Sequence, residues 1–303
     1  MKNTEFFNRI ILYWFTLATG IFMGCETIVD AKLPEHQPVL VANSFFQPDS
    51  TWRAHISSST PILSDADFPA VENATVEILE GPQVISRLTH IGNGNYRAAT
   101  GTPIPGRAYQ LRVSAPDYET ISASDIIPQP IAINSVAILD SSVEADPNLM
   151  EISIDFSDPP NEKNYYHLSF LIETNSGERY ATYFFTNDPL LAETNSDIDI
   201  SSEPDFSGIQ AVFDDALIAG ERYTLNINVY NFIPAPELKQ VSMTLSAVSK
   251  SFFDYFKTSE LQEQTEDNPF AEPTLVYNNI KNGLGIFAGY HPTSMTILEN
   301  FDQ

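Results

Sequence analysis

Gly106-Arg107-Ala108-Tyr109-Gln110-Leu111-Arg112-Val113 is the stretch that best defines the fold of this 303-residue chain. A glycine suited to a turn precedes a segment in which Tyr109, Leu111 and Val113 alternate with other residues. This period of two is typical of a half-buried β-strand. The same pattern, G-x-x-Y-x-L-x-aliphatic, recurs in Gly220-Glu221-Arg222-Tyr223-Thr224-Leu225-Asn226-Ile227. It predicts two strands whose tyrosine, leucine and aliphatic side chains face a core.

Other short apolar or alternating segments surround both copies, and turn residues such as Gly92-Asn93-Gly94 and Pro103-Ile104-Pro105-Gly106 separate them. Short strands with turn signals at intervals of about ten residues are typical of β-sandwiches. Besides the two copies, we expect strands at 39–42, 52–56, 74–79, 84–90, 95–98, 131–139, 150–156, 165–172, 180–186, 208–213 and 240–247.

Pro128-Gln129-Pro130 interrupts this series, and proline is unsuited to both helix interiors and central strands. We therefore expect a mainly β fold with two domains in tandem, an N-terminal β-sandwich at 38–127 and a C-terminal one at 131–303. The repeated pattern resembles a late strand of immunoglobulin-like or fibronectin-like modules. Duplication of one domain and the chance recurrence of ordinary strand chemistry both remain open.

A change of period marks one segment as helical. Phe252, Phe253, Phe256 and Leu261 recur at spacings near three and four, which predicts an amphipathic helix at about 249–264 that packs on the second sandwich. This aromatic stripe can serve as core or as a ligand groove, and core packing is the commoner use.

Gly283-Leu284-Gly285-Ile286-Phe287-Ala288 has the letters of a dinucleotide-binding fingerprint. That motif requires the start of a helix to hold the pyrophosphate, within a βαβ unit. The flanking segment, 274–288, is strand-like instead. We interpret the glycines as sites of close strand packing or a bulge, and expect no cofactor.

Cys25 is the only cysteine, and it follows Lys2, Arg9 and an apolar run at 10–23. Such an N-terminus is typical of a secretory signal and is too short to favour a permanent membrane span. Phe22-Met23-Gly24-Cys25 resembles a bacterial lipobox, in which the thiol is acylated, for example with palmitate. We therefore expect a signal peptide at 1–24, a lipidated Cys25 and a tether at 25–37. A buried thiol or an intermolecular disulfide is the alternative.

The charge of the chain excludes one class of partner. Its 40 acidic and 15 basic residues give a formal net charge of −25, and removal of 1–24 leaves the balance almost unchanged. A nucleic-acid backbone requires a basic surface, which this chain cannot supply. An acidic surface also keeps a protein soluble beside a lipid layer.

Signals for catalysis are weak. The five histidines are scattered, and neither H-E-x-x-H nor G-x-S-x-G occurs. His167 alternates with Tyr166 and Leu168 on an expected strand, so we expect it to face solvent. A spatially assembled triad has little support.

One acidic stretch offers oxygen atoms at nearly alternate positions, as a calcium ion requires. Its residues are Asn195, Asp197, Asp199, Glu203 and Asp205, and Ile200 stands where an EF-hand loop needs glycine. Asp197, Asp199, Glu203 and Asp205 are therefore weak calcium candidates, and a solvated acidic loop explains them better.

The order of these features resembles the domain of unknown function 4249 family of Bacteroidota outer-membrane lipoproteins. The resemblance rests on the lipobox, 38–43, 71–76, 92–96, 106–113 and above all Tyr277-Asn278-Asn279-Ile280-Lys281-Asn282-Gly283-Leu284-Gly285-Ile286-Phe287. It implies a surface-facing lipoprotein that accompanies a TonB-dependent receptor, with no known enzymatic activity and no agreed binding residues. We expect a lipid-anchored outer-membrane accessory protein. A surface hydrolase with an acidic site and an adhesin or structural envelope component are the alternatives.

Overall fold

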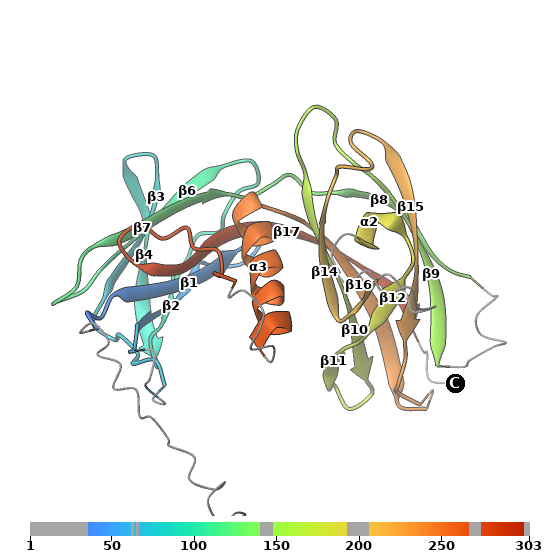
Figure 1. Ribbon diagram of the computed structural model, residues 1–303, viewed down its shortest axis with the longest axis horizontal. Coiled ribbons are helices and arrows are strands. Elements are labelled where there is room, and N and C mark those ends of the chain that lie inside the picture. The colour runs from blue at the N-terminus through green and yellow to red at the C-terminus, as the bar shows by residue number, and fades with distance from the viewer. Residues whose placement is uncertain are drawn as a thin grey trace, which may run out of the picture. The chain divides into compact units, whose positions relative to one another are not determined.

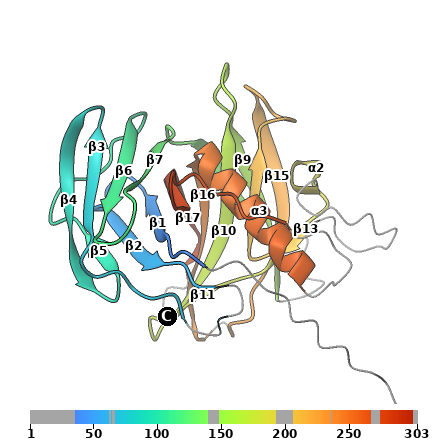
Figure 2. The ribbon, with the colours of Figure 1, turned by 60° about the vertical axis from the view of Figure 1, so that its left-hand side comes forward.

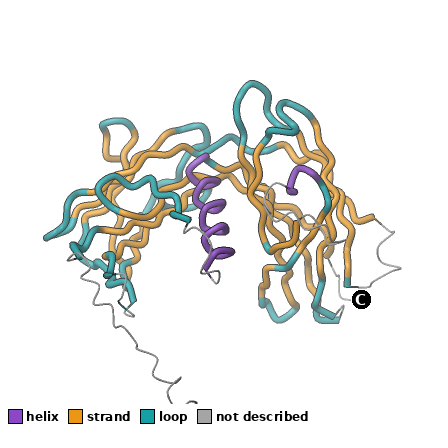
Figure 3. Tube along the Cα trace, in the orientation of Figure 1, coloured by secondary structure: helices purple, strands orange, loops and turns teal. Residues whose placement is uncertain are grey.

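The computed structural model describes residues 36–61, 64, 67–139, 148–192, 206–234, 236–266 and 274–299. Strands dominate these residues (Figure 3). The strands are β1 Leu40–Phe46, β2 Arg53–Ser58, β3 Thr75–Glu80, β4 Gln83–Gly92, β5 Asn95–Arg97, β6 Ala108–Ser114, β7 Ile121–Ile126, β8 Ala132–Leu139, β9 Leu149–Ser157, β10 Tyr165–Thr174, β11 Arg179–Ala181, β12 Phe184–Thr186, β13 Phe206–Gly208, β14 Gln210–Asp214, β15 Arg222–Tyr230, β16 Leu238–Val248 and β17 Leu284–Glu299. The helices are α2 Pro189–Ala192 and α3 Lys250–Glu266.

Residues 38–303 form one compact unit. Its larger sheet has the strand order β11-β10-β16-β17-β1-β2-β5-β4-β3-β6-β7, and β14 also pairs with β10. The end of this order curls back, because Ser122 of β7 forms a β-bridge with Lys281, just before β17. The curled part encloses the first core. In this core the ring centroids of Phe46 and Phe287 are 4.4 Å apart, and those of Trp52 and Tyr109 are 4.8 Å apart.

The second core lies between two sheets. A smaller sheet with the order β13-β12-β15-β9-β8 contributes alternate residues of β9 and β15, and β10 and β16 of the larger sheet face them. The alternation in β9 and β10 agrees with the sequence. Ile152, Ile154 and Phe156 are buried on one strand, and Tyr166, Leu168, Phe170 and Ile172 on the other.

Strand β17 belongs to both cores (Figure 1). Its first part, from Leu284 to Gly289, pairs in parallel with β1, and its remainder pairs antiparallel with β16. Phe287 therefore lies in the first core, while Ile297 packs against the second. The expected domain of residues 131–303 thus contributes its last strand to the core of residues 38–127.

Glycines allow β17 to approach its neighbours. Gly285 has a φ of +112°, and a Cβ atom there would lie 2.2 Å from the carbonyl oxygen of Ala42 in β1. A Cβ atom at Gly289 would lie 2.3 Å from the carbonyl oxygen of Ile126. The interpretation of Gly285 as a close-packing glycine is confirmed, and the fingerprint letters lie in a strand and not at the start of a helix.

Helix α3 crosses the face of the larger sheet where β17 passes between the two cores (Figure 2). The Phe252 and Phe253 side chains are buried there with Val212, Ile286 and Ala288. Phe45 of β1 completes this third cluster, with ring centroids 5.5 Å from Phe252 and 5.8 Å from Tyr255 and Phe256. The expected helix exists, and it contacts β1 of the first core as well as the second sandwich.

The mainly β fold with one long helix near the C-terminus is confirmed. Two expected strands are wrong as single elements. Residues 180–186 divide into β11 and β12, and 208–213 into β13 and β14, because the chain crosses there from one sheet to the other. Strand β7 was not expected. The assignment of two immunoglobulin-like or fibronectin-like domains stays a prediction.

Candidate functional site

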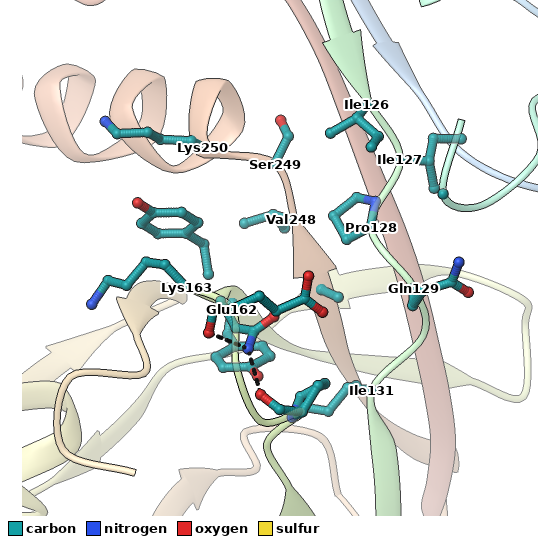
Figure 4. Close-up of a pocket in the computed structure, with 16 residues that line it drawn as sticks. Ile126, Ile127, Pro128, Gln129, Ile131, Glu162, Lys163, Val248, Ser249 and Lys250 are labelled. Carbon is teal, nitrogen blue, oxygen red and sulfur yellow. Dashed lines mark hydrogen bonds between the residues drawn. The ribbon is translucent and has the colours of Figure 1, made fainter. Parts of the chain in front are cut away.

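A cavity of about 440 Å³ lies where three connections meet (Figure 4). One wall is the segment from β7 to β8, with Ile127 and Gln129. The turn before β10 supplies Lys163, and the junction of β16 with α3 supplies Val248 and Ser249. Apolar and polar side chains thus line one space, which is the usual composition of a small-ligand site.

Ser249 fixes one side of this cavity. Its hydroxyl oxygen accepts a hydrogen bond from the backbone N–H of Phe252, as the N-cap of α3 does. The same hydroxyl donates to the Asp125 carboxylate over 2.5 Å, and that carboxylate also accepts the backbone N–H of Gly289 over 2.9 Å. Burial raises the pKa of Asp125 to about 6, although these hydrogen bonds oppose the shift.

Tyr166, which lines the cavity, belongs to a buried polar pair. Tyr166 donates its hydroxyl hydrogen to Asp158, and the backbone N–H of Gly220 donates to the other oxygen of that carboxylate over 2.6 Å. Burial and the neighbouring Asp158 carboxylate both raise the pKa of the Tyr166 phenol. The phenol therefore stays protonated and acts as a hydrogen-bond donor.

Lys163 stands at the rim with its charge already paired. Its ammonium group lies 2.9 Å from an Asp215 carboxylate oxygen and 3.1 Å from one of Asp214. Lys250, also at the rim, lies 2.5 Å from Asp254. Both lysine charges are therefore already paired with carboxylates of the chain itself.

In the part of the chain that the structure describes, Ser249 has no hydrogen bond to a histidine. Its hydroxyl hydrogen points to Asp125, and the nearby His291 places its Nδ1 atom 3.3 Å from the backbone oxygen of Pro128. Within the described ranges, no three His, Cys, Asp or Glu side chains come together as metal ligands would. The arrangement suits non-covalent binding.

The sequence predicted that His167 faces solvent, and this prediction is wrong. His167 lies on the outer face of β10 under α3, with ring centroids 5.5 Å from Phe252 and 5.7 Å from Phe256. Burial lowers its pKa, and a hydrogen bond to Gln210 opposes the shift. The alternation of the strand was right, but α3 covers the face that was expected to be open.

The other predicted site residues lie outside the described residues. These are Cys25 and the calcium candidates Asp197, Asp199, Glu203 and Asp205. Sequence reasoning missed Asp125 and Ser249. A serine directly before the helical period is an N-cap signal that marks Ser249, whereas no local signal marks Asp125.

The family model described as Domain of unknown function (DUF4249) matches residues 26–296. No curated protein matches the sequence. Among the described residues, no helix has both the length and the apolar character needed to cross a membrane.

Proposed function

Because the chain belongs to the DUF4249 family, we propose that it is a lipid-anchored accessory protein of the outer membrane. In this proposal it partners a TonB-dependent receptor and helps to capture or admit that receptor's ligand. The anchor is an acylated Cys25, and the working part is the β unit of residues 38–303.

The observation that carries this proposal is the position of Cys25. It is the only cysteine of the chain and stands where a signal-like segment ends, shortly before the β unit starts at residue 38. Each buried acyl methylene contributes about 0.8 kcal/mol to membrane binding, so several acyl chains hold a protein at a membrane almost permanently.

The cavity supports a binding role. It has a mixed lining, and its polar groups Ser249, Tyr166 and Lys163 are already engaged by neighbours. Such preorganised walls suit recognition of a ligand, since little ordering is required on binding. The receptor as partner follows from the family resemblance alone.

Co-purification tests the proposal. The chain, with a C-terminal tag, is isolated from its native membranes in a mild zwitterionic detergent, and its companions are identified by mass spectrometry. We expect a TonB-dependent receptor in near-stoichiometric amount. The variant Cys25→Ser is the control, because it leaves the β unit intact and is expected to lose both the membrane fraction and the receptor. Recovery of the unaltered chain alone overturns the proposal.

A further inference from the structure

A second hollow, of about 450 Å³, lies on the outer face of the smaller sheet. Its lining includes Glu151, Phe185, Asn187, Asn226 and Asn228. It is separate from the cavity at Ser249, because the two share no lining residue.

The pairing of three strands arranges these side chains in a row. Phe185 of β12 pairs with Asn228 of β15, and Asn228 pairs with Glu151 of β9. Neighbouring positions Leu225, Ile227 and Val229 point into the second core. Because side chains alternate along a strand, Asn226 and Asn228 point away from that core.

Two tyrosines lie beside this row, in the direction in which β15 runs. Tyr230 is the next outward residue of β15 and is 39% exposed, and Tyr183 on the adjacent chain segment is 60% exposed. The backbone N–H of Tyr230 donates to the carbonyl oxygen of Tyr183 over 2.9 Å, so the two residues are direct neighbours. One end of the face is therefore aromatic, and the hollow beside it is rich in amides.

The chemistry of this face limits its ligand. No hydrogen bond to another described residue engages the side-chain amides of Asn226 and Asn228, and each amide can donate two hydrogen bonds and accept others. Among the described residues that line the hollow there is no Lys or Arg, but Glu151 and Asp188 are present, which disfavours anionic ligands.

An added peptide strand does not suit this face either. Strand β15 is paired on both sides, with β12 and β9, so its backbone groups are already used. A ligand must be recognised by side chains. Exposed aromatic rings beside amides fit a ligand with apolar C–H faces and many hydroxyl groups, which is the composition of a carbohydrate.

We propose that the outer face of β12, β15 and β9 binds a neutral oligosaccharide, with Tyr183 and Tyr230 stacking on sugar rings and Asn226, Asn228 and Glu151 bonding to hydroxyl groups. The inference deepens the proposed function, on whose ligand-capturing role it rests, by naming a ligand class. Binding to this face itself requires neither the receptor nor the membrane.

Calorimetric titration of the purified full chain tests the inference. The detergent must contain no sugar, because a glycosidic headgroup would compete. The probes are cellohexaose, maltohexaose, xylohexaose and mannohexaose, with hexagalacturonate as the anionic control. We expect at least one neutral probe to bind and hexagalacturonate not to bind.

Variants locate the site. Asn228→Ala and Tyr183→Ala are each expected to weaken binding about tenfold, as the loss of one hydrogen bond or stacking contact implies. Thr224→Ala is the matched control, since Thr224 also points outward from β15 but lies outside the hollow. It is expected to leave Kd unchanged. Asn226→Ser provides a second test that does not depend on the folding of the first two variants.

The inference is overturned if no neutral probe binds, if hexagalacturonate binds equally well, or if Tyr183→Ala, Asn228→Ala and Asn226→Ser all bind as the unaltered chain does. Co-purification of the receptor needs no sugar. If no sugar binds but the receptor is still recovered, this inference alone is overturned. If a sugar binds but no receptor is recovered, only the proposed receptor partnership is overturned.

Discussion

The carboxylate of Asp125 accepts a 2.5 Å hydrogen bond from the hydroxyl of Ser249, which is 124 residues away in the sequence. Asp125 lies on β7 beside the first core, and Ser249 caps the helix that covers β17. The same carboxylate binds the backbone N–H of Gly289. One side chain thus joins three elements near the cavity.

Asp125 is expected to make stability depend on pH. Its pKa is about 6 in the folded chain and returns towards 3.8 on unfolding. The folded state therefore holds the proton more tightly, so this contribution is complete below about pH 4 and is lost as the pH rises through 6. Urea unfolding of the unaltered chain and Asp125→Asn from pH 4 to 7 measures it. The stability of the unaltered chain relative to the variant is expected to fall by up to about 1.4 kcal/mol per pH unit. A difference that is constant over this range contradicts the assignment.

Ser249→Ala is expected to lower the free energy of unfolding by about 1–2 kcal/mol, because it removes both the N-cap of α3 and the hydrogen bond to Asp125. Ser249→Thr is the control, since it keeps a hydroxyl and is expected to retain most of the stability. Chemical unfolding at pH 7 gives both values. Equal losses of unfolding free energy in the two variants would show that the Ser249 hydroxyl does not stabilise the fold.

Phe45→Ala tests whether α3 is attached to β1. The ring contacts Phe252, Tyr255 and Phe256, so its removal is expected to cost about 2–3 kcal/mol, below the full value for a buried phenylalanine because Phe45 is only partly buried. Phe68→Ala removes a ring that is 67% exposed and is expected to cost little. Hydrogen exchange should also show faster exchange in α3 for Phe45→Ala. Unchanged exchange in α3 would contradict this attachment.

Gly285→Ala and Gly92→Ala form a matched pair. Both glycines have a φ near +115°, so the backbone strain on substitution is similar. A Cβ atom at Gly92 meets nothing within 4 Å, whereas at Gly285 it would lie 2.2 Å from the oxygen of Ala42. We expect Gly92→Ala to cost about 1 kcal/mol and Gly285→Ala clearly more. Thermal unfolding measures both. Equal costs would show that β1 and β17 can separate without penalty.

Local patterns were sufficient for most of the strands that lie within one sheet, with β7 as an exception. The alternation at Ile152, Ile154 and Phe156 predicted both the strand and its buried face. The two G-x-x-Y-x-L copies were also right about their inward residues, since Leu111 and Leu225 are both buried. Helix α3 was found because its aromatic spacing differs from that of any strand.

Features that depend on distant partners could not be found in this way. The division of 180–186 has no local signal, because no glycine or proline separates β11 from β12 although they join different sheets. Nor does the sequence show that β17 serves two cores, since its pairing with β1 is set by residues near the start of the chain. The cavity at Ser249 is built from three separate connections, and the row from Phe185 to Glu151 exists only through strand register.

The state of Cys25 tests the central claim most directly. Mass spectrometry of the N-terminal peptide, taken from protein isolated from membranes, measures it. The account predicts a chain that begins at Cys25 and carries acyl groups on that residue. A free thiol at Cys25 in a chain that still retains residues 1–24 would contradict it.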